Sequence, residues 1–171
     1  MKKAVLFTGA GGQGVNAIAL LLAGCAAQAG HATCLPEHGP EQRGGYARCT
    51  VVVSDTEICS PMPKKYDYVV AMDELSAMKY AAQLNPGGKM VLNADLVPQS
   101  PGEHKLFIPA DSIAAELGNP RSANIVLLGA LVGVSGLLPE ALVKDAIAAK
   151  FKGQVNLDAF QKGLDITQNK S

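Results

Sequence analysis

A glycine-rich turn between an apolar run and a long apolar segment constrains the fold of this chain more than any other feature. Residues 4–8 form the apolar run, and residues 9–14 read Gly-Ala-Gly-Gly-Gln-Gly. Residues 15–29 are rich in Ala and Leu with hardly a polar face, which predicts a deeply buried helix. A second strand is predicted at 32–35, where Pro36 stops it. Strand, glycine turn, helix and strand in this order open a doubly wound α/β fold.

The glycine turn offers a site for an anion. Its spacing is G-x-G-x-x-G, in which glycines allow a tight turn and free N–H groups at the helix start attract negative charge. Glu37 follows Gly14 by 23 residues, roughly where a dinucleotide-binding fold places the acid that contacts a ribose. NAD binding is therefore one hypothesis. The other is that the glycines only let the helix pack against the strand, with the Gln13 amide pinning the turn.

The rest of the chain continues the α/β pattern within one domain. Strand 46–54 alternates its faces, with Cys49, Val51 and Val53 on one of them. It is predicted to pair with a strand at 58–60 as an antiparallel hairpin. We therefore expect a single domain over residues 1–171: a Rossmann-like three-layer sandwich with a mostly parallel sheet and a hairpin addition. Further strands are predicted at 66–72, 89–93 and 106–109, a turn at 85–88, and helices at 74–83, 112–117, 140–151, 156–163 and from Ser122 or Asn124 to 132.

Composition and charge exclude several classes of function. The chain has 171 residues, of which 48% are apolar, and its 15 basic and 15 acidic side chains cancel. Nucleic-acid binders usually carry a basic excess, which is missing in this sequence. The apolar runs fall short of the about 20 residues that span a membrane, and the first run is too short for a signal peptide. We therefore expect a cytoplasmic protein that binds neither nucleic acid nor membrane.

The cysteines indicate no metal site. Cys25, Cys34, Cys49 and Cys59 are separated by 9, 15 and 10 residues, spacings that match no zinc or iron–sulfur motif. We expect them to be small buried side chains kept reduced in the cytosol; the alternative is a reactive thiol among them.

A second motif makes the glycine turn more specific. Residues 37–45 read Glu-His-Gly-Pro-Glu-Gln-Arg-Gly-Gly, and they follow the turn by about 25 residues. Together the two motifs resemble the gamma subunit of 2-oxoacid:ferredoxin oxidoreductases, the gamma-type domain of pyruvate, 2-oxoglutarate and ketoisovalerate oxidoreductases. His38 departs from the family, whose members often carry an aromatic residue there. The resemblance covers nearly the whole chain and extends to 51–55, 58–61, Asn124, 128–130, Phe160 and Gly163.

The resemblance implies a function within a larger complex. Complete enzymes of this family decarboxylate a 2-oxoacid on thiamine diphosphate with Mg²⁺, pass two electrons through iron–sulfur clusters to ferredoxin, and transfer the acyl group to coenzyme A. The Gly-Pro-Glu-x-Arg-Gly-Gly form is more similar to members that act on 2-oxoglutarate or branched-chain 2-oxoacids. The chain is then a subunit without its own cofactor, not catalytic alone, with a structural or CoA-side role. Its implied partners are alpha and beta subunits, a ferredoxin-like delta subunit in some complexes, and, when it is isolated, a second copy of itself.

The candidate residues are therefore anion-binding or interface residues, with no catalytic or metal-ligating residue among them. Arg43 is the main candidate, because its forked donors suit a phosphate of coenzyme A or a carboxylate of a partner. The alternative is that Glu41 neutralises it locally. Arg48 is a second candidate cation, whereas Asn124 is expected to cap a helix. The full set comprises Gly9, Gly11, Gly12, Gln13, Gly14, Glu41, Arg43, Gly44 and Gly45.

Two other functions stay open at this point. One is an independent NAD-binding oxidoreductase of the Rossmann type, and the other is a stand-alone binding module for a nucleotide or acyl-CoA. A subunit should co-purify with partners, whereas a dehydrogenase does not need them. Loss of NAD binding on replacement of Glu37 would favour the first of these alternatives.

Overall fold

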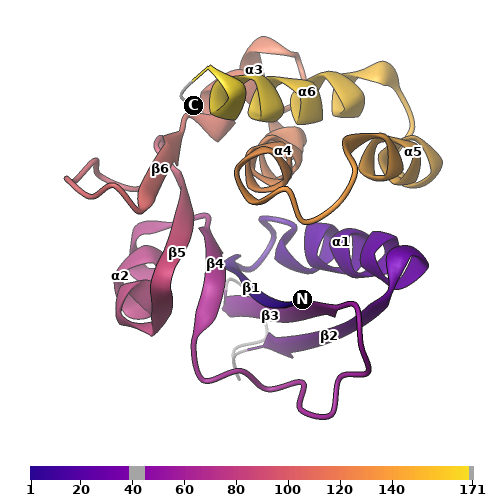
Figure 1. Cartoon of the computed structure of the whole chain (residues 1–171). Helices are drawn as coiled ribbons and strands as arrows, with labels where there is room; N and C mark the ends of the chain where they lie inside the picture. Colours follow the sequence, from indigo (N-terminus) through magenta and orange to yellow (C-terminus); the bar gives the residue numbers. More distant parts are fainter. Residues whose placement is uncertain (39–44, 170–171) are drawn as a thin grey trace.

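A six-stranded sheet organises the protein in the computed structural model, which describes residues 1–38 and 45–169. The strand order is β2-β3-β1-β4-β5-β6 (Figure 1). β4, β5 and β6 run parallel to β1, and β2 has the same direction because β3, between β1 and β2, is antiparallel to both. The strands are β1 (Lys2–Ala10), β2 (His31–His38), β3 (Tyr46–Ser54), β4 (Tyr66–Ala71), β5 (Leu84–Asn93) and β6 (Lys105–Ile108).

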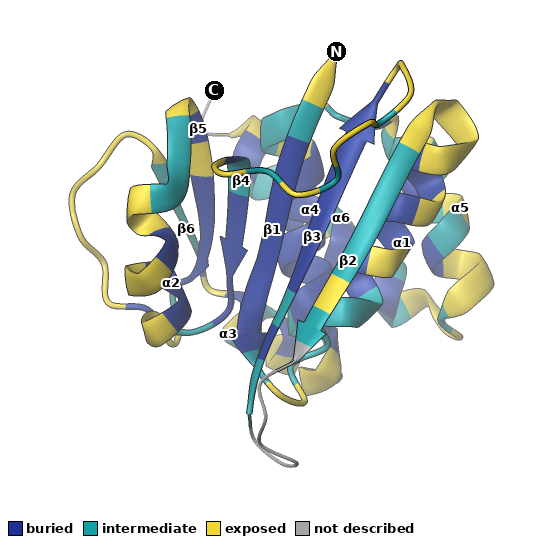
Figure 2. Ribbon diagram, turned by 90° about the horizontal axis from the view of Figure 1, so that it is seen from below, coloured by how far each residue is buried: buried dark blue, intermediate teal, exposed yellow. Residues whose placement is uncertain are grey.

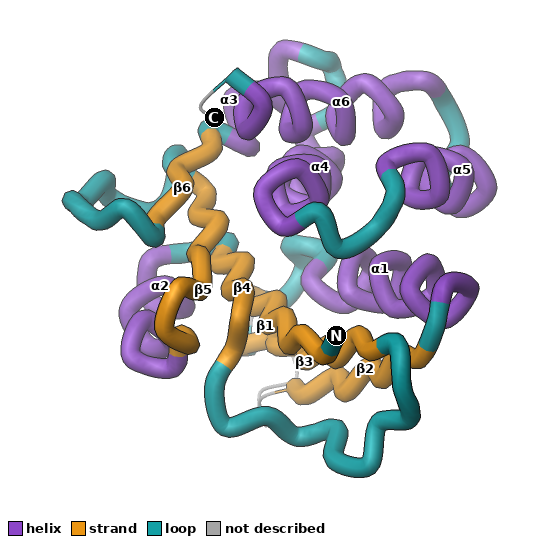
Figure 3. Tube along the Cα trace, in the orientation of Figure 1, coloured by secondary structure: helices purple, strands orange, loops and turns teal. Residues whose placement is uncertain are grey.

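Helices cover the two faces of the sheet unequally. α1 and α4 lie on one face, with α5 and α6 packed further out, whereas α2 lies on the other face beside β4 and β5 (Figures 1 and 3). This arrangement is the expected three-layer α/β sandwich. The helices are α1 (Val15–Ala29), α2 (Glu74–Tyr80), α3 (Ala110–Glu116), α4 (Ala123–Ser135), α5 (Glu140–Lys150) and α6 (Gln154–Gln168), with 3-10 turns at Ala81–Gln83 and Pro120–Ser122.

The central strand β1 is buried on both faces, which explains its continuous apolar sequence. Val5 and Phe7 pack into the core under α1 and α4, whereas Leu6 packs with Val52 and Tyr80 on the α2 side. Figure 2 shows the segment between β3 and β4 crossing this second face, where α2 does not reach. The sheet therefore has two apolar cores, and the larger one lies under the helices that border the glycine turn.

Helix α4 packs against α6 through glycines. A Cβ atom at Gly129 would overlap the carbonyl oxygen of Phe160, and one at Gly163 would overlap the carbonyl oxygen of Val126. The two backbones are therefore in direct contact, and nearly all of α4 is buried. This contact holds α4, and with it Asn124 at its first turn, in a fixed place above the sheet.

Three sequence-based predictions of secondary structure were wrong. Residues 58–60 form no strand, because β3 already pairs with β1 on one side and with β2 on the other. The hairpin addition is instead β2 with β3. Pro36 does not stop β2, since an edge strand tolerates a missing N–H group. Residues 85–88 lie within β5, where a register shift opposite Tyr66 and Tyr68 accommodates them as a bulge.

Candidate ligand pocket at the glycine turn

The conformation of the glycine turn is fixed by two positive-φ glycines and by hydrogen bonds between Gln13 and Ala10. Gly12 and Gly14 have φ values of 90° and 75°, the left-handed region that favours glycine. Oε1 of Gln13 accepts a hydrogen bond from the Ala10 N–H at 2.7 Å, and the Gln13 N–H donates to the Ala10 carbonyl at 3.3 Å. The prediction that the Gln13 amide pins the turn is confirmed. Gly9 lies behind the turn, where a Cβ atom would meet the Cβ of Met72 at 2.9 Å.

The two sequence motifs meet in space. The Gly11 N–H donates a hydrogen bond to the Gly45 carbonyl oxygen at 2.6 Å, which joins the glycine turn to the start of β3. Glu41, Arg43 and Gly44 lie outside the described residues, so their predicted roles stay predictions.

Asn124 has a different role from the helix cap expected of it. Ser122 occupies the N-cap position of α4, and the Nδ2 group of Asn124 donates to the Gly14 carbonyl oxygen at 3.3 Å. The Asn124 residue is only 9% exposed, and its buried Oδ1 atom has no hydrogen-bond partner within the described part of the chain. An unsatisfied buried acceptor is costly, which is typical of a group that awaits a ligand or water. Asn124 therefore ties α4 to the turn and presents an acceptor beside it.

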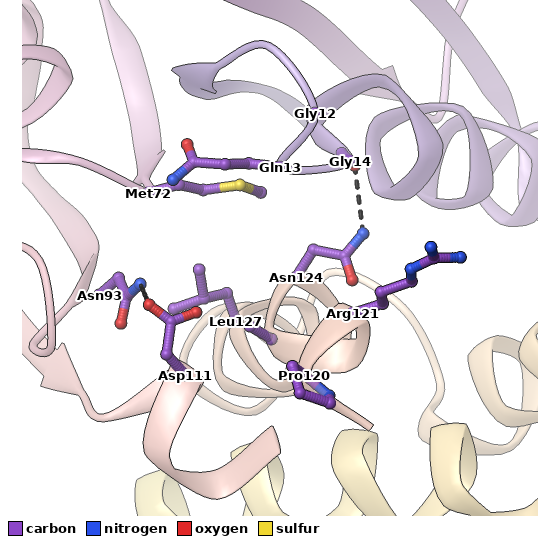
Figure 4. A pocket seen from close by; sticks show the side chains of 11 residues that line it. Gly12, Gln13, Gly14, Met72, Asn93, Asp111, Pro120, Arg121, Asn124 and Leu127 are labelled. Carbon is purple, nitrogen blue, oxygen red and sulfur yellow. Dashed lines mark hydrogen bonds between the residues drawn. The ribbon is translucent and has the colours of Figure 1, made fainter. Parts of the chain in front are cut away.

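A pocket of about 440 Å³ opens between the turn and α4 (Figure 4). It lies at the carboxyl ends of β1, β4 and β5: the glycine turn follows β1, Met72 follows β4, and Asn93 ends β5. The chain leaves β1 toward the β2 edge and β4 toward the β6 edge, and α/β folds bind ligands where connections diverge in this way. The lining residues are Gly12, Gln13, Gly14, Met72, Asn93, Asp111, Pro120, Arg121, Ala123, Asn124 and Leu127.

The two ends of the pocket carry different chemistry. At one end, Nδ2 of Asn93 donates to Oδ2 of Asp111 at 3.0 Å, which leaves acceptor oxygens facing the pocket (Figure 4). At the other end, Arg121 stands near the N-terminus of the 15-residue helix α1, whose peptide dipoles add positive charge. The pocket therefore suits a ligand with an anionic group at one end and hydroxyl or amide donors at the other.

A second cavity of about 420 Å³ continues this positive end. It shares Arg121 and Asn124 with the first pocket and adds Lys150 and Lys152. Nζ of Lys150 donates to the Ala17 carbonyl at 3.3 Å, so this ammonium lies at the first turns of α1. Within residues 1–38 and 45–169, none of these three cations has a carboxylate partner within 4.0 Å. They form an unneutralised basic arc beside the glycine turn.

Glu37 does not contribute to the pocket. It lies on β2, which β3 separates from β1, and it forms an ion pair with Arg48. This pairing raises the pKa of the Arg48 guanidinium above its ordinary value, and Nη1 of Arg48 also donates to the Tyr80 hydroxyl at 3.2 Å. The candidate ribose acid and the candidate second cation thus neutralise each other away from the site. The geometry removes the argument for NAD binding that rested on Glu37.

Sequence reasoning missed the residues that complete the pocket: Met72, Asn93, Asp111 and Arg121. Asn93 gave the clearest indication, because a polar residue ended the strand predicted at 89–93. Asp111 and Arg121 come from segments whose approach to the turn depends on the packing of α3 and α4. No local sequence pattern predicts that Asp111 and Arg121 lie close to the glycine turn.

Three general features of the described residues bear on function. No group of three His, Cys, Asp or Glu side chains in the described part of the chain is placed to hold a metal ion. No helix among the same residues is long and apolar enough to span a membrane. The cysteines differ from expectation, because Cys25 and Cys49 are buried but Cys34 is half-buried and Cys59 is exposed.

Comparison with known proteins identifies related chains. A family model described as pyruvate ferredoxin/flavodoxin oxidoreductase matches residues 4–166. The ketoisovalerate oxidoreductase subunit VorA of Methanothermobacter marburgensis is 35% identical over 171 residues, which cover 94% of this chain and 36% of VorA. The chain thus spans about a third of the length of that relative. The 2-oxoglutarate synthase subunit KorC of Methanothermobacter thermautotrophicus is 32% identical over 181 residues and matches along 97% of this chain and 95% of its own length.

Two solved structures have the same fold over nearly the whole chain. The gamma subunit of a keto/oxoacid ferredoxin oxidoreductase from Geobacter sulfurreducens has a TM-score of 0.86 at 26% identity, covering 99% of this chain and 98% of its own. The 2-oxoglutarate:ferredoxin oxidoreductase of Magnetococcus marinus, with 2-oxoglutarate, coenzyme A and succinyl-CoA bound, has a TM-score of 0.88 at 26% identity. The match covers 98% of this chain and 31% of that one.

Proposed function

The chain belongs to the pyruvate ferredoxin/flavodoxin oxidoreductase family, and from this premise we propose that it is the gamma subunit of a 2-oxoacid:ferredoxin oxidoreductase complex. The match to KorC along nearly its full length supports a separate small subunit. The similarity to both KorC and VorA supports 2-oxoglutarate or a branched-chain 2-oxoacid as the substrate of the complex. The products would be an acyl-CoA, CO₂ and reduced ferredoxin.

The contribution of this chain is to hold the coenzyme A side of the reaction. The observation that carries this proposal is the pocket at the glycine turn. Its positive end, formed by the α1 N-terminus and Arg121, suits a phosphate, and the basic arc extends that end to Lys150. Coenzyme A carries several phosphate charges together with amide and hydroxyl groups. The related Magnetococcus marinus enzyme is recorded with coenzyme A bound, which supports this assignment.

The hydrogen-bond acceptors that line the pocket would then set the orientation of the ligand. Oδ1 of Asn124 is an acceptor, so the ligand would place a hydroxyl or amino group there rather than a phosphate. The carboxylate of Asp111 is likewise an acceptor at the far end. The Asp111 carboxylate would repel a second phosphate at the far end, which leaves the basic arc as the place for additional negative charge.

The redox cofactors belong to the partner subunits in this proposal. Thiamine diphosphate with Mg²⁺ would supply the decarboxylation chemistry, and iron–sulfur clusters would carry electrons to ferredoxin. An iron–sulfur cluster needs four ligands, usually cysteines. Among the described residues the cysteines in contact are Cys34 and Cys49, which are too few for a cluster. The chain itself binds and orients, within a complex of alpha and beta subunits in the cytoplasm.

Anaerobic purification of the chain from its native cells tests the proposal. The expected result is co-purification with larger, cluster-bearing subunits that reduce a dye only when a 2-oxoacid and coenzyme A are both present. The preferred 2-oxoacid then identifies the substrate. A colourless protein that purifies without partners and supports no such activity would contradict the proposal.

A further inference from the structure

Two of the four cysteines lie against each other on neighbouring strands. Cys34 on β2 and Cys49 on β3 have their Sγ atoms 3.2 Å apart, close enough for one thiol to donate a weak hydrogen bond to the other. In the antiparallel register Cys34 stands opposite Val51 and Cys49 opposite Pro36, so the two cysteines are diagonal neighbours. Cys49 belongs to the core under α1, and Cys34 packs against that core. The proximity is therefore set by two paired strands and not by a flexible segment.

We propose that Cys34 and Cys49 form a site of reversible oxidation, at which an intramolecular disulfide closes between β2 and β3. Bond formation requires the two sulfur atoms to approach from 3.2 Å to the about 2.0 Å of a disulfide. Among the described residues β2 is an edge strand that pairs with β3 alone, so it can adjust toward its neighbour without breaking another described pairing.

The unequal exposure of the two thiols determines which of them reacts first. Cys34 is half-buried, whereas Cys49 is fully buried, so a peroxide reaches Cys34 first. The Cys34 sulfur attacks one peroxide oxygen, which yields a sulfenic acid and water. The Cys49 sulfur then displaces the hydroxyl group as a second water and forms the S–S bond. The peroxide accepts two electrons, and the two thiol protons leave in the two waters.

Burial also makes this site slow to react. It raises the pKa of the Cys49 thiol, with the neighbouring Cys34 sulfur adding to the shift, so little of the nucleophilic thiolate is present near neutral pH. The pair should therefore respond to sustained oxidation rather than to brief exposure. A thiol reductant would restore both cysteines, because the product is a disulfide and not a higher oxide.

A variant that keeps only this pair tests the proposal. Cys25→Ser combined with Cys59→Ser removes the buried lone thiol and the exposed thiol and leaves Cys34 and Cys49 in the full chain. Treated with hydrogen peroxide under anaerobic conditions, it should lose both free thiols and the mass of two hydrogen atoms. Dithiothreitol should restore both. Digestion should give one cross-linked peptide pair containing Cys34 and Cys49, from a protein that stays the size of the untreated one.

Matched variants make the result decisive. Adding Cys34→Ser or Cys49→Ser to the pair-only protein should abolish the mass loss, and Cys34→Ser should also protect Cys49 from peroxide. Retention of both thiols in the pair-only protein would overturn the proposal, as would a sulfinic acid at Cys34 beside a free Cys49, or cross-linking only between molecules. The outcome is independent of the proposed function, because it needs neither a 2-oxoacid nor coenzyme A.

Discussion

The glycine turn and the contact between α4 and α6 both depend on glycine, for different physical reasons. In the turn, Gly12 and Gly14 adopt positive φ values, and the space beside Gly12 is open. Between the helices, Gly129 and Gly163 have ordinary helical conformations, and each faces the backbone of the other helix. The first region uses glycine for conformation and access, and the second uses it for close packing.

This difference separates a binding region from a structural one within the same domain. A turn that leaves space beside its backbone can admit a ligand, whereas two helices in backbone contact leave no space for one. The two regions are nevertheless linked, because Asn124 at the start of α4 donates to the Gly14 carbonyl. Tight packing of α4 on α6 thus fixes one wall of the pocket.

The largest expected effect is a loss of stability when the helix contact is widened. Gly129→Ala or Gly163→Ala should each lower the free energy of unfolding by about 3 kcal/mol or more, because the overlapping atoms belong to backbone that cannot rotate away. Urea unfolding followed by circular dichroism measures this. Gly24→Ala in α1 is the matched control: nothing lies within 4 Å of its Cβ position, and it should stabilise by about 0.5–1 kcal/mol. Equal stability of the Gly129 variant and the wild type would refute the packing argument.

The next effect is on ligand binding at the turn. Gly14→Ala introduces a side chain at φ 75° and displaces the Asn124 amide, so the KM for coenzyme A in the assembled complex should rise at least about tenfold. Gly12→Ala is strained in the same way but meets no neighbour, and should raise that KM less. Steady-state kinetics of complexes that contain either variant measure both KM values. The Gly12 variant reports backbone strain alone, and the Gly14 variant reports strain together with displacement of the Asn124 side chain. Equal KM values would show that Asn124 is not part of the site.

Asn124→Asp tests the amide with little change in shape. A carboxylate cannot donate to the Gly14 carbonyl, and it places negative charge beside the proposed phosphate site. The KM for coenzyme A should rise about tenfold, equivalent to about 1.4 kcal/mol, with the KM for the 2-oxoacid unchanged. Asn85→Asp is the control: Asn85 lies near the start of β5, at the end away from Asn93 and the pocket, and this change should alter neither KM. A rise in the KM for the 2-oxoacid alone would show that Asn124 does not contribute to coenzyme A binding.

The smallest effects should come from the basic arc, because its charged residues are exposed. Arg121→Gln and Lys150→Gln should each weaken coenzyme A binding a few-fold at low salt, and the difference should shrink as salt screens the charges. Lys144→Gln, on the same helix as Lys150 but paired with Glu140, should have no such effect. Titration at two ionic strengths distinguishes them, and a salt-independent loss would argue against a charge interaction.

Sequence reasoning located the fold and the turn because both depend on local patterns. Helix 15–29 and strand 46–54 were predicted with the bounds that the structure has, whereas Gly9 and Ala10, the first two residues of the predicted turn, lie at the end of β1. The pairing of β2 with β3 was missed, because strand 46–54 was paired with the nearer segment 58–60 and Pro36 was expected to end the strand at 32–35.

The far wall of the pocket was missed for a related reason. Asn93, Asp111 and Arg121 lie on three segments that the tertiary packing brings to the turn, and no residue spacing encodes that meeting. The Gln13 amide was predicted correctly, since its bond to Ala10 is local. A hydrogen bond between residues close in sequence could thus be predicted from the sequence. The bond from Asn124 to Gly14 could not be, because it depends on where α4 packs.

Hydrogen exchange of the assembled complex, measured by mass spectrometry with and without coenzyme A, tests most directly whether the pocket at the glycine turn holds coenzyme A. Exchange at residues 10–16 and 120–125 should be slower when coenzyme A is present, because the ligand would cover the glycine turn and the start of α4. Exchange in the contact between α4 and α6 should stay unchanged. Unaltered exchange at the turn in a complex that turns over coenzyme A would contradict the claim that this pocket holds it.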